Sequence, residues 1–184
     1  MGGHNFQDLV ETLECAVTQK GERLVALSEA SPVLLVFLRH AGCPFCRQAL
    51  SDIARVRGAI ERSGTRIVLV HMGDSEAIGK LLLKYGLAGV DRICDPEQKL
   101  CSAFGLKRGT LGQLFGPKVA WRAFKSAVLS RHGIGRTSAD SFQMPGLFLI
   151  GDANIVRRFR HRTSADRPDY AGICAGPLKS GGAL

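Results

Sequence analysis

The chain has 184 residues, of which 45% are hydrophobic, and its formal net charge is +9. A chain of this length can bury a sizeable core as a single domain, and six cysteines are too sparse for a disulfide-built scaffold, so we interpret them as thiols. The charge alone would suit nucleic acid or an acidic membrane, but the densest basic stretch, residues 157–167, has no nucleic-acid motif around it, so neither partner is expected.

Residues 1–7 lack the basic-then-apolar order of a signal peptide. The longest apolar run, Val33–Leu38, is far shorter than the roughly 18 residues that indicate a membrane span. The sequence therefore predicts a cytoplasmic protein that works in a reducing compartment.

The chain opens with the pattern of an amphipathic helix that follows Asn5, a residue that commonly caps helices. Its apolar positions recur at helical spacing: Phe6, Leu9, Val10, Leu13, Ala16 and Val17. Val33–Leu38 then forms a continuous apolar run, which is typical of a central strand covered on both faces.

A second helix is predicted to begin at Pro44, because apolar residues form one stripe from Cys46 to Ile60, and Gly64 marks its end. Residues 66–72 resemble a second strand. Strand, helix and strand at this spacing form a right-handed parallel βαβ unit. Cys43 would then lie at the carboxyl end of a parallel strand.

The remaining elements complete an α/β domain with a central mixed sheet flanked by helices. We expect a helix from Ser75 to Gly86, a short strand at 92–94, a helix at 96–104, a helical insertion at 106–142, a β-hairpin with strands at 146–150 and 155–160, and a flexible tail at 176–184. The whole chain, 1–184, is expected to be one domain.

Cys43-Pro44-Phe45-Cys46 is the strongest chemical signal in the sequence. A helix N-terminus favours a thiolate through its partial positive charge, and proline is tolerated at the first helical position. Cys43 is thereby predicted to be a nucleophile and Cys46 the buried thiol that resolves its mixed disulfide. Any of Arg39, His40 and Arg47 that turns toward Cys43 would favour its thiolate further.

Two other interpretations of the CxxC remain open, namely ordinary structural thiols or half of a zinc site. A second CxxC is missing, so no metal or other cofactor is expected. Cys15, Cys94 and Cys101 fall in predicted helices and a strand, where cysteine behaves as a small buried hydrophobe. Cys174 lies in a loop near the tail and is expected to be more exposed. His71 and His132 show no partner pattern.

Several separated motifs resemble the thioredoxin-fold superfamily, and more closely its peroxiredoxin-like, AhpC/TSA-type branch related to selenoprotein L. They are residues 37–47 with the CxxC, residues 105–109, Met144-Pro145 with the strand 146–150, and residues 160–170. The resemblance implies that Pro145 is a cis-proline facing the dithiol and that the Met144 backbone binds an incoming chain. Pro44 and Phe45 are expected to line the same substrate groove.

Three positions depart from the peroxiredoxin pattern. Val36 and His40 stand where peroxiredoxins carry a proline and a hydroxyl residue, and Pro145 stands where they place an arginine. Our first hypothesis is therefore a thiol-disulfide oxidoreductase in antioxidant or thiol homeostasis, with a thiol or disulfide partner of the thioredoxin or glutathione type.

The second hypothesis is a thiol-dependent peroxidase, in which peroxide oxidises Cys43 and Cys46 resolves it. A third is a non-enzymatic binding module that contacts a partner through Phe115, Trp121 and Phe124 of the 106–142 insertion. The sequence also allows a homodimer.

Overall fold

The computed structural model describes residues 6–110, 142–163 and 165–176. In these residues five strands form one sheet in the order β3-β2-β1-β4-β5. The strands are β1 (Val33–Leu38), β2 (Arg66–His71), β3 (Asp91–Cys94), β4 (Gly146–Gly151) and β5 (Asn154–Arg160). β1, β2 and β3 run parallel, whereas β4 is antiparallel to β1 and to β5. The predicted mixed sheet, with a βαβ half followed by a hairpin, is confirmed.

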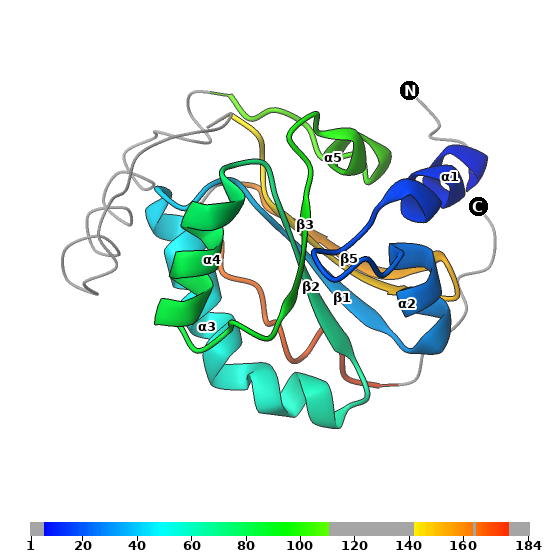
Figure 1. Ribbon diagram of the computed structural model, residues 1–184, viewed down its shortest axis with the longest axis horizontal. Helices are drawn as coiled ribbons and strands as arrows, with labels where there is room; N and C mark the ends of the chain where they lie inside the picture. Colours follow the sequence, from blue (N-terminus) through cyan, green and yellow to red (C-terminus); the bar gives the residue numbers. More distant parts are fainter. Residues whose placement is uncertain (1–5, 111–141, 164, 177–184) are drawn as a thin grey trace.

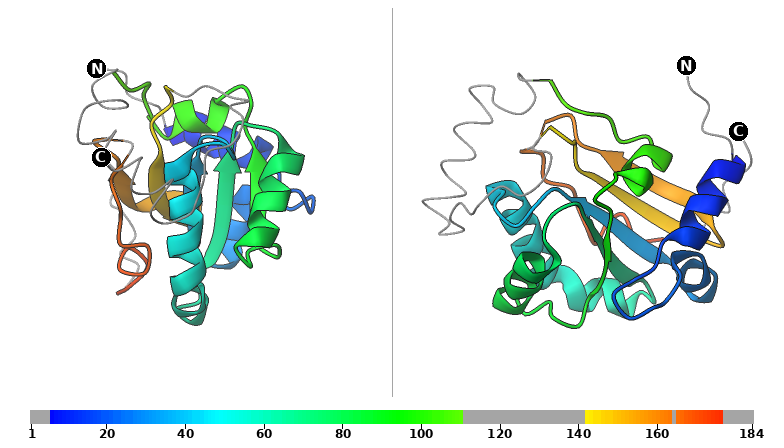
Figure 2. Two further views of the ribbon diagram at one scale, coloured as in Figure 1. Left: turned by 90° about the vertical axis from the view of Figure 1, so that its left-hand side faces the viewer. Right: turned by 45° about the horizontal axis from the view of Figure 1, so that its top comes forward.

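Helices cover both faces of this sheet (Figure 1). α3 (Pro44–Arg62) and α4 (Ser75–Lys84) lie on one face, and α1 (Phe6–Cys15), α2 (Leu24–Ala30) and α5 (Lys99–Ala103) lie on the other. The two turned views in Figure 2 show the same three layers. The predicted α/β architecture with an amino-terminal helix is thereby confirmed.

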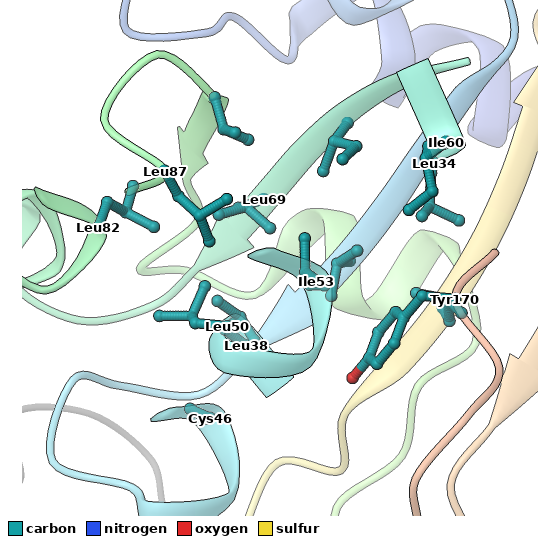
Figure 3. Close-up of a cluster of buried hydrophobic side chains, with 14 of the residues drawn as sticks. Leu34, Leu38, Cys46, Leu50, Ile53, Ile60, Leu69, Leu82, Leu87 and Tyr170 are labelled. Atoms are coloured by element: carbon teal, nitrogen blue, oxygen red, sulfur yellow. The ribbon is translucent and has the colours of Figure 1, made fainter. Parts of the chain in front are cut away.

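Successive side chains of β1 point to opposite faces of the sheet, and the core accordingly consists of two clusters. Leu34, Val36 and Leu38 face α3 and α4, and the intervening residues Val33, Leu35 and Phe37 face the other helices. Every residue of β1 is buried, as expected for a central strand with a continuous apolar run. Figure 3 shows Leu34 and Leu38 beside α3 side chains, with Cys46 at the end of the same cluster. The dithiol therefore stands on packed, rigid elements.

The start of α3 is set by two adjacent residues. Cys43 is the N-cap residue with an extended backbone (φ −76°, ψ 122°), and Pro44 occupies the first helical turn. Proline suits this place because its fixed φ is already helical and its missing N–H would have had no partner in the helix. Past the other end of α3, Gly64 has a left-handed φ of 77°, which glycine adopts without steric cost.

Several element boundaries differ from the predicted ones. α2 was not predicted, because its seven residues are too short to show helical periodicity and its N-cap Arg23 makes no side-chain cap bond. α4 is capped by Asp74, whose carboxylate accepts from the Glu76 N–H, and not by Ser75. α5 begins at Lys99 and not at 96, because Gln98 before it has a left-handed φ of 59°.

Most of the predicted 106–142 insertion, with its Phe115, Trp121 and Phe124, lies outside the described residues, as does the predicted tail beyond residue 176. Among the residues that are described, no helix has the length and apolar character needed to cross a membrane.

Candidate active site

The two cysteines of the CxxC lie at the carboxyl end of β1, where the chain turns into α3. The Cys43 N–H donates to the His40 carbonyl oxygen at 3.1 Å, which closes the turn between β1 and α3. Both side chains are buried, with Cys43 3% and Cys46 4% exposed. The two thiols share a hydrogen bond in which Cys46 is the donor and Cys43 the acceptor. The pair lies at the carboxyl end of the parallel strand β1, as the βαβ pattern predicted.

Arg39, the residue directly after β1, contacts both sulfurs. Its guanidinium Nη2 donates to Cys43 Sγ at 2.9 Å, and its backbone N–H donates to Cys46 Sγ at 3.3 Å. The Met72 N–H donates to the Arg39 carbonyl oxygen and so ties this residue to the end of β2. Arg39 is itself buried, so its charge acts on the sulfurs with little screening by water.

These contacts separate the acidities of the two thiols. The hydrogen bond from Cys46, the charge of Arg39 and the helix amides of Phe45 and Cys46 lower the pKa of Cys43 to about 6, although burial opposes them. The same hydrogen bond and burial raise the pKa of Cys46 well above that of an ordinary thiol. At neutral pH the dithiol therefore consists of one thiolate, Cys43, and one thiol, Cys46.

The other two residues predicted to favour the thiolate occupy different places. Burial and the neighbouring Arg39 lower the pKa of His40 to about 4, so its ring is neutral at neutral pH and supplies no positive charge. Arg47 Nε donates to the Ala41 carbonyl oxygen at 2.8 Å and braces the loop before the dithiol. Arg39 therefore supplies a positive charge in direct contact with Cys43 Sγ.

The four residues predicted to form the substrate groove take different places around the dithiol. The Met144–Pro145 peptide bond is trans, since the described residues contain no cis peptide bond, so the expected cis-proline is wrong. The Met144 N–H is already used, because it donates to the Lys107 carbonyl oxygen at 3.2 Å. Pro145 and Phe45 both line a cavity next to Cys46, whereas Pro44 opens α3.

That cavity has a volume of about 30 Å³ and lies between the start of α3, the start of β4 and the segment after β5. Its polar wall contains residues that sequence reasoning did not assign to the site: His161, Asp166, Arg167, Tyr170 and Asp52. Figure 3 shows Tyr170 and Cys46 in the same cluster, from segments far apart in the sequence. The signal for most of these residues was present, since 160–170 is one of the stretches that carry the family resemblance.

Ion pairs and hydrogen bonds fix the segment that closes this cavity. Arg167 binds Asp52 of α3 through two bonds, Nη2 to Oδ1 at 2.6 Å and Nε to Oδ2 at 3.0 Å. Asp166 accepts hydrogen bonds from the N–H groups of Arg162 and Thr163 and from the Thr163 hydroxyl. The backbone after β5 is therefore held against α3 next to the dithiol.

The remaining cysteines differ in exposure from the sequence expectation. Cys101 is buried as predicted, but Cys15 and Cys94 are exposed, because they end α1 and the edge strand β3. Cys174, expected in an exposed loop, is buried, since its segment packs on the core beside α3. Within the described parts of the chain, no group of three His, Cys, Asp or Glu side chains could hold a metal ion.

Comparisons with known proteins agree with this architecture. Prostamide/prostaglandin F synthase of Danio rerio is 28% identical over 143 residues, which cover 74% of this chain and 69% of that protein. The Sus scrofa protein of the same name is 26% identical over 161 residues, covering 84% and 77% of the two chains.

Solved structures of peroxiredoxins share the fold. Peroxidoxin BcpB of Mycobacterium tuberculosis superposes with a TM-score of 0.58 at 16% identity and covers 86% of each chain. Peroxiredoxin Q of Xanthomonas campestris gives a TM-score of 0.56 at 15% identity and covers 79% of this chain and 78% of its own. The predicted thioredoxin-like fold is thereby confirmed.

The AhpC/TSA family model matches residues 8–159, which span β1 to β5 and include the CxxC. The sequence motifs, the mixed sheet and this match lead to the same assignment, which also confirms the predicted oxidoreductase class. The chain belongs to the AhpC/TSA family, whose members are oxidoreductases built on the thioredoxin fold.

Proposed function

We propose that the protein is a thiol-disulfide oxidoreductase in which Cys43 is the nucleophile and Cys46 the resolving thiol. The observation that carries this proposal is the contact of Arg39 with both sulfurs, together with the opposite displacement of their pKa values. A nucleophile must be a thiolate at working pH, and a resolving thiol acts only after the first step. The dithiol has one group in each of these states.

The reaction then follows from the order of the two sulfurs. The Cys43 thiolate attacks a disulfide of the partner, an S–S bond forms to Cys43, and the other partner sulfur leaves as a thiolate with the electron pair. Cys46 loses its proton and attacks Cys43 Sγ, which closes the Cys43–Cys46 disulfide and releases the second partner thiol. The partner gains two electrons, and a thiol donor of the thioredoxin or glutathione type returns the protein to its dithiol form.

The apolar residues beside the dithiol suit a surface that contacts the partner. Phe45 is half-buried and Pro145 lines the cavity beside Cys46, so the two apolar side chains border the approach to the dithiol. We propose that they, with Pro44 at the first turn of α3, shape the surface on which the partner lies. The Met144 N–H is bonded to Lys107 and its carbonyl oxygen already accepts from Gln143 Nε2 at 3.4 Å, so an incoming chain would have only the second lone pair of that oxygen.

A specific observation also favours peroxidase activity as a second candidate. Peroxiredoxins place an arginine where this chain has Pro145, and here Arg39 supplies a guanidinium at 2.9 Å from Cys43 Sγ from another position. A peroxide is small enough to approach a residue such as Cys43 that is 3% exposed. The Cys43 thiolate would take one peroxide oxygen and become a sulfenic acid, while the O–O bond breaks and the other oxygen takes up a proton and leaves as water or an alcohol. Cys46 would then condense with the sulfenic acid, which forms the disulfide and releases water.

We further propose that residues 1–184 act as one domain and that the protein works in the cytoplasm. The support for the second point is that all six cysteines are free thiols, which is the state that a reducing compartment maintains.

A single-turnover experiment tests these proposals. The reduced protein is mixed with oxidised glutathione or with hydrogen peroxide, quenched with N-ethylmaleimide, and analysed by mass spectrometry for the Cys43–Cys46 disulfide. Disulfide chemistry predicts the bond with oxidised glutathione, and peroxidase activity predicts it with peroxide at a higher rate. Absence of the bond with both oxidants would overturn the proposed function.

A further inference from the structure

The resolving step has a chemical requirement that the dithiol itself does not meet. In the reduced protein the proton of Cys46 is shared with the Cys43 thiolate. Once Cys43 has formed a mixed disulfide, this acceptor is gone, while burial still disfavours ionisation of Cys46. The proton of Cys46 must therefore pass to another group before Cys46 can attack.

The cavity beside Cys46 provides the route. Its volume of about 30 Å³ exceeds the roughly 10–15 Å³ that one water molecule needs. Cys46 and His161 both line it, although His161 lies just after β5, far along the chain. Among the described residues that line the cavity, His161, Asp52 and Asp166 carry side-chain atoms with lone pairs that can bind a proton.

The two carboxylates are already engaged. Asp52 Oδ1 accepts from Arg55 and Arg167, and its Oδ2 accepts from Arg167 as well. Asp166 accepts three hydrogen bonds from Arg162 and Thr163, which hold its pKa below the ordinary value although burial opposes them. The oxygens of both carboxylates are therefore already occupied by hydrogen-bond donors.

His161 differs from them in two ways. Its Nδ1 is buried and has no hydrogen-bond partner, whereas the backbones of Pro145 and Asp166 both accept hydrogen bonds from the ring. A neutral imidazole carries one N–H and one lone pair, so this arrangement leaves the lone pair on Nδ1. Burial, assisted by the charge of Arg39, lowers the pKa of His161 below its ordinary value although Asp166 opposes this, so the ring is neutral at neutral pH.

We propose that His161 is the proton acceptor for Cys46 in the resolving step, acting through a water molecule in the cavity that both residues line. The Cys46 proton moves to His161 Nδ1 and the Cys46 thiolate attacks Cys43 Sγ. The partner sulfur leaves with the electron pair and takes up a proton as His161 returns to its neutral form. This inference rests on the proposed dithiol function and assigns a role to a residue beyond the CxxC.

The experiment uses 5,5′-dithiobis(2-nitrobenzoate), which releases one coloured thiolate when Cys43 attacks and a second when Cys46 resolves the adduct. Cys15 and Cys94 are replaced by serine in all variants, because both are exposed and would also react. His161→Gln retains a donor for the Pro145 backbone and removes the base. His71→Gln is the matched control, because His71 is also a buried histidine bonded to a backbone oxygen, that of Gly73, but it does not line this cavity.

We expect the second release to be independent of pH above neutrality in the parent protein and in His71→Gln. In His161→Gln it should be at least about tenfold slower at neutral pH and rise about tenfold per pH unit, because Cys46 then ionises only to solvent. The first release should stay unchanged. An unchanged second release in His161→Gln, or a loss of both releases, would overturn the role of His161. No second release in the parent protein would instead overturn the proposed function.

Discussion

The guanidinium of Arg39 and the sulfur of Cys43 meet at 2.9 Å although both side chains are buried. Burial alone would raise the pKa of a thiol and suppress its reactivity. The pKa of Cys43 is nevertheless lowered, because the hydrogen bond from Cys46 and the charge of Arg39 together outweigh burial. The pair explains how a sulfur can be shielded from solvent and still be a nucleophile.

Removal of this charge should make Cys43 less reactive. In Arg39→Met we expect the pKa of Cys43 to rise by about one to three units, because an adjacent opposite charge shifts a pKa by that amount. The iodoacetamide reaction rate at neutral pH should fall accordingly. Arg47→Met is the matched control, since Arg47 binds the Ala41 carbonyl oxygen. Equal loss in the two variants would show that Arg39 has no special effect on the sulfur.

The pH dependence of alkylation tests the acidity of Cys43 directly. The thiolate fraction of a group with a pKa of about 6 is half-maximal near that pH, well below the 9.0 of an unperturbed thiol. We expect the Cys43 rate, followed by peptide mass spectrometry, to rise through this midpoint and to reach a plateau at neutral pH. A rate that keeps rising to alkaline pH would mean that Cys43 is an ordinary thiol.

The hydrogen bond from Cys46 is the largest cause of the low pKa of Cys43. Cys46→Ser keeps a donor at this position, whereas Cys46→Ala removes it. We therefore expect the alkylation midpoint of Cys43 to move to higher pH in Cys46→Ala and to move less in Cys46→Ser. Equal midpoints in the two variants would show that Cys46 acts on Cys43 by some means other than donation.

The cluster on the sheet face covered by α1, α2 and α5 should contribute to the stability of the fold without direct contact with the dithiol. Phe148, Phe37 and Phe104 form a cluster with ring centroids 4.7 to 5.6 Å apart. Phe148→Ala should lower the free energy of unfolding by about 3–5 kcal/mol, the usual cost of removing a buried ring. Phe159→Ala, at a partly exposed position on edge strand β5, should cost less in the same urea titration. The reverse order would contradict the assigned core.

The sequence predicted the sheet well because its signals are local and strong. Val33–Leu38 is observed with the same bounds, and the hairpin turn lies at the predicted place between two apolar runs. The positive φ of Ala153 in that turn does not follow from its residue type, because alanine rarely adopts it. α2 and the start of α5 were missed because neither carries a long periodic pattern. Local pattern therefore predicted the strands better than the short helices.

The site was predicted only where its residues are neighbours in the sequence. Cys43 and Cys46 follow from their spacing and from the strand before them. The contact of Arg39 with Cys43 depends on side-chain direction in a loop, which no periodicity encodes. His161 comes near Cys46 through pairing of β4 with β1 and of β5 with β4, a tertiary relation between segments more than 100 residues apart.

The central claim is that Cys43 attacks and Cys46 resolves, and mapping of glutathione adducts tests it most directly. One equivalent of oxidised glutathione is added to the reduced protein and to its Cys43→Ser and Cys46→Ser variants, and each adduct is located by mass spectrometry. We predict a Cys43–Cys46 disulfide in the parent protein, glutathione on Cys43 in Cys46→Ser, and no adduct on Cys46 in Cys43→Ser. Adducts confined to the exposed Cys15 and Cys94 would contradict the claim.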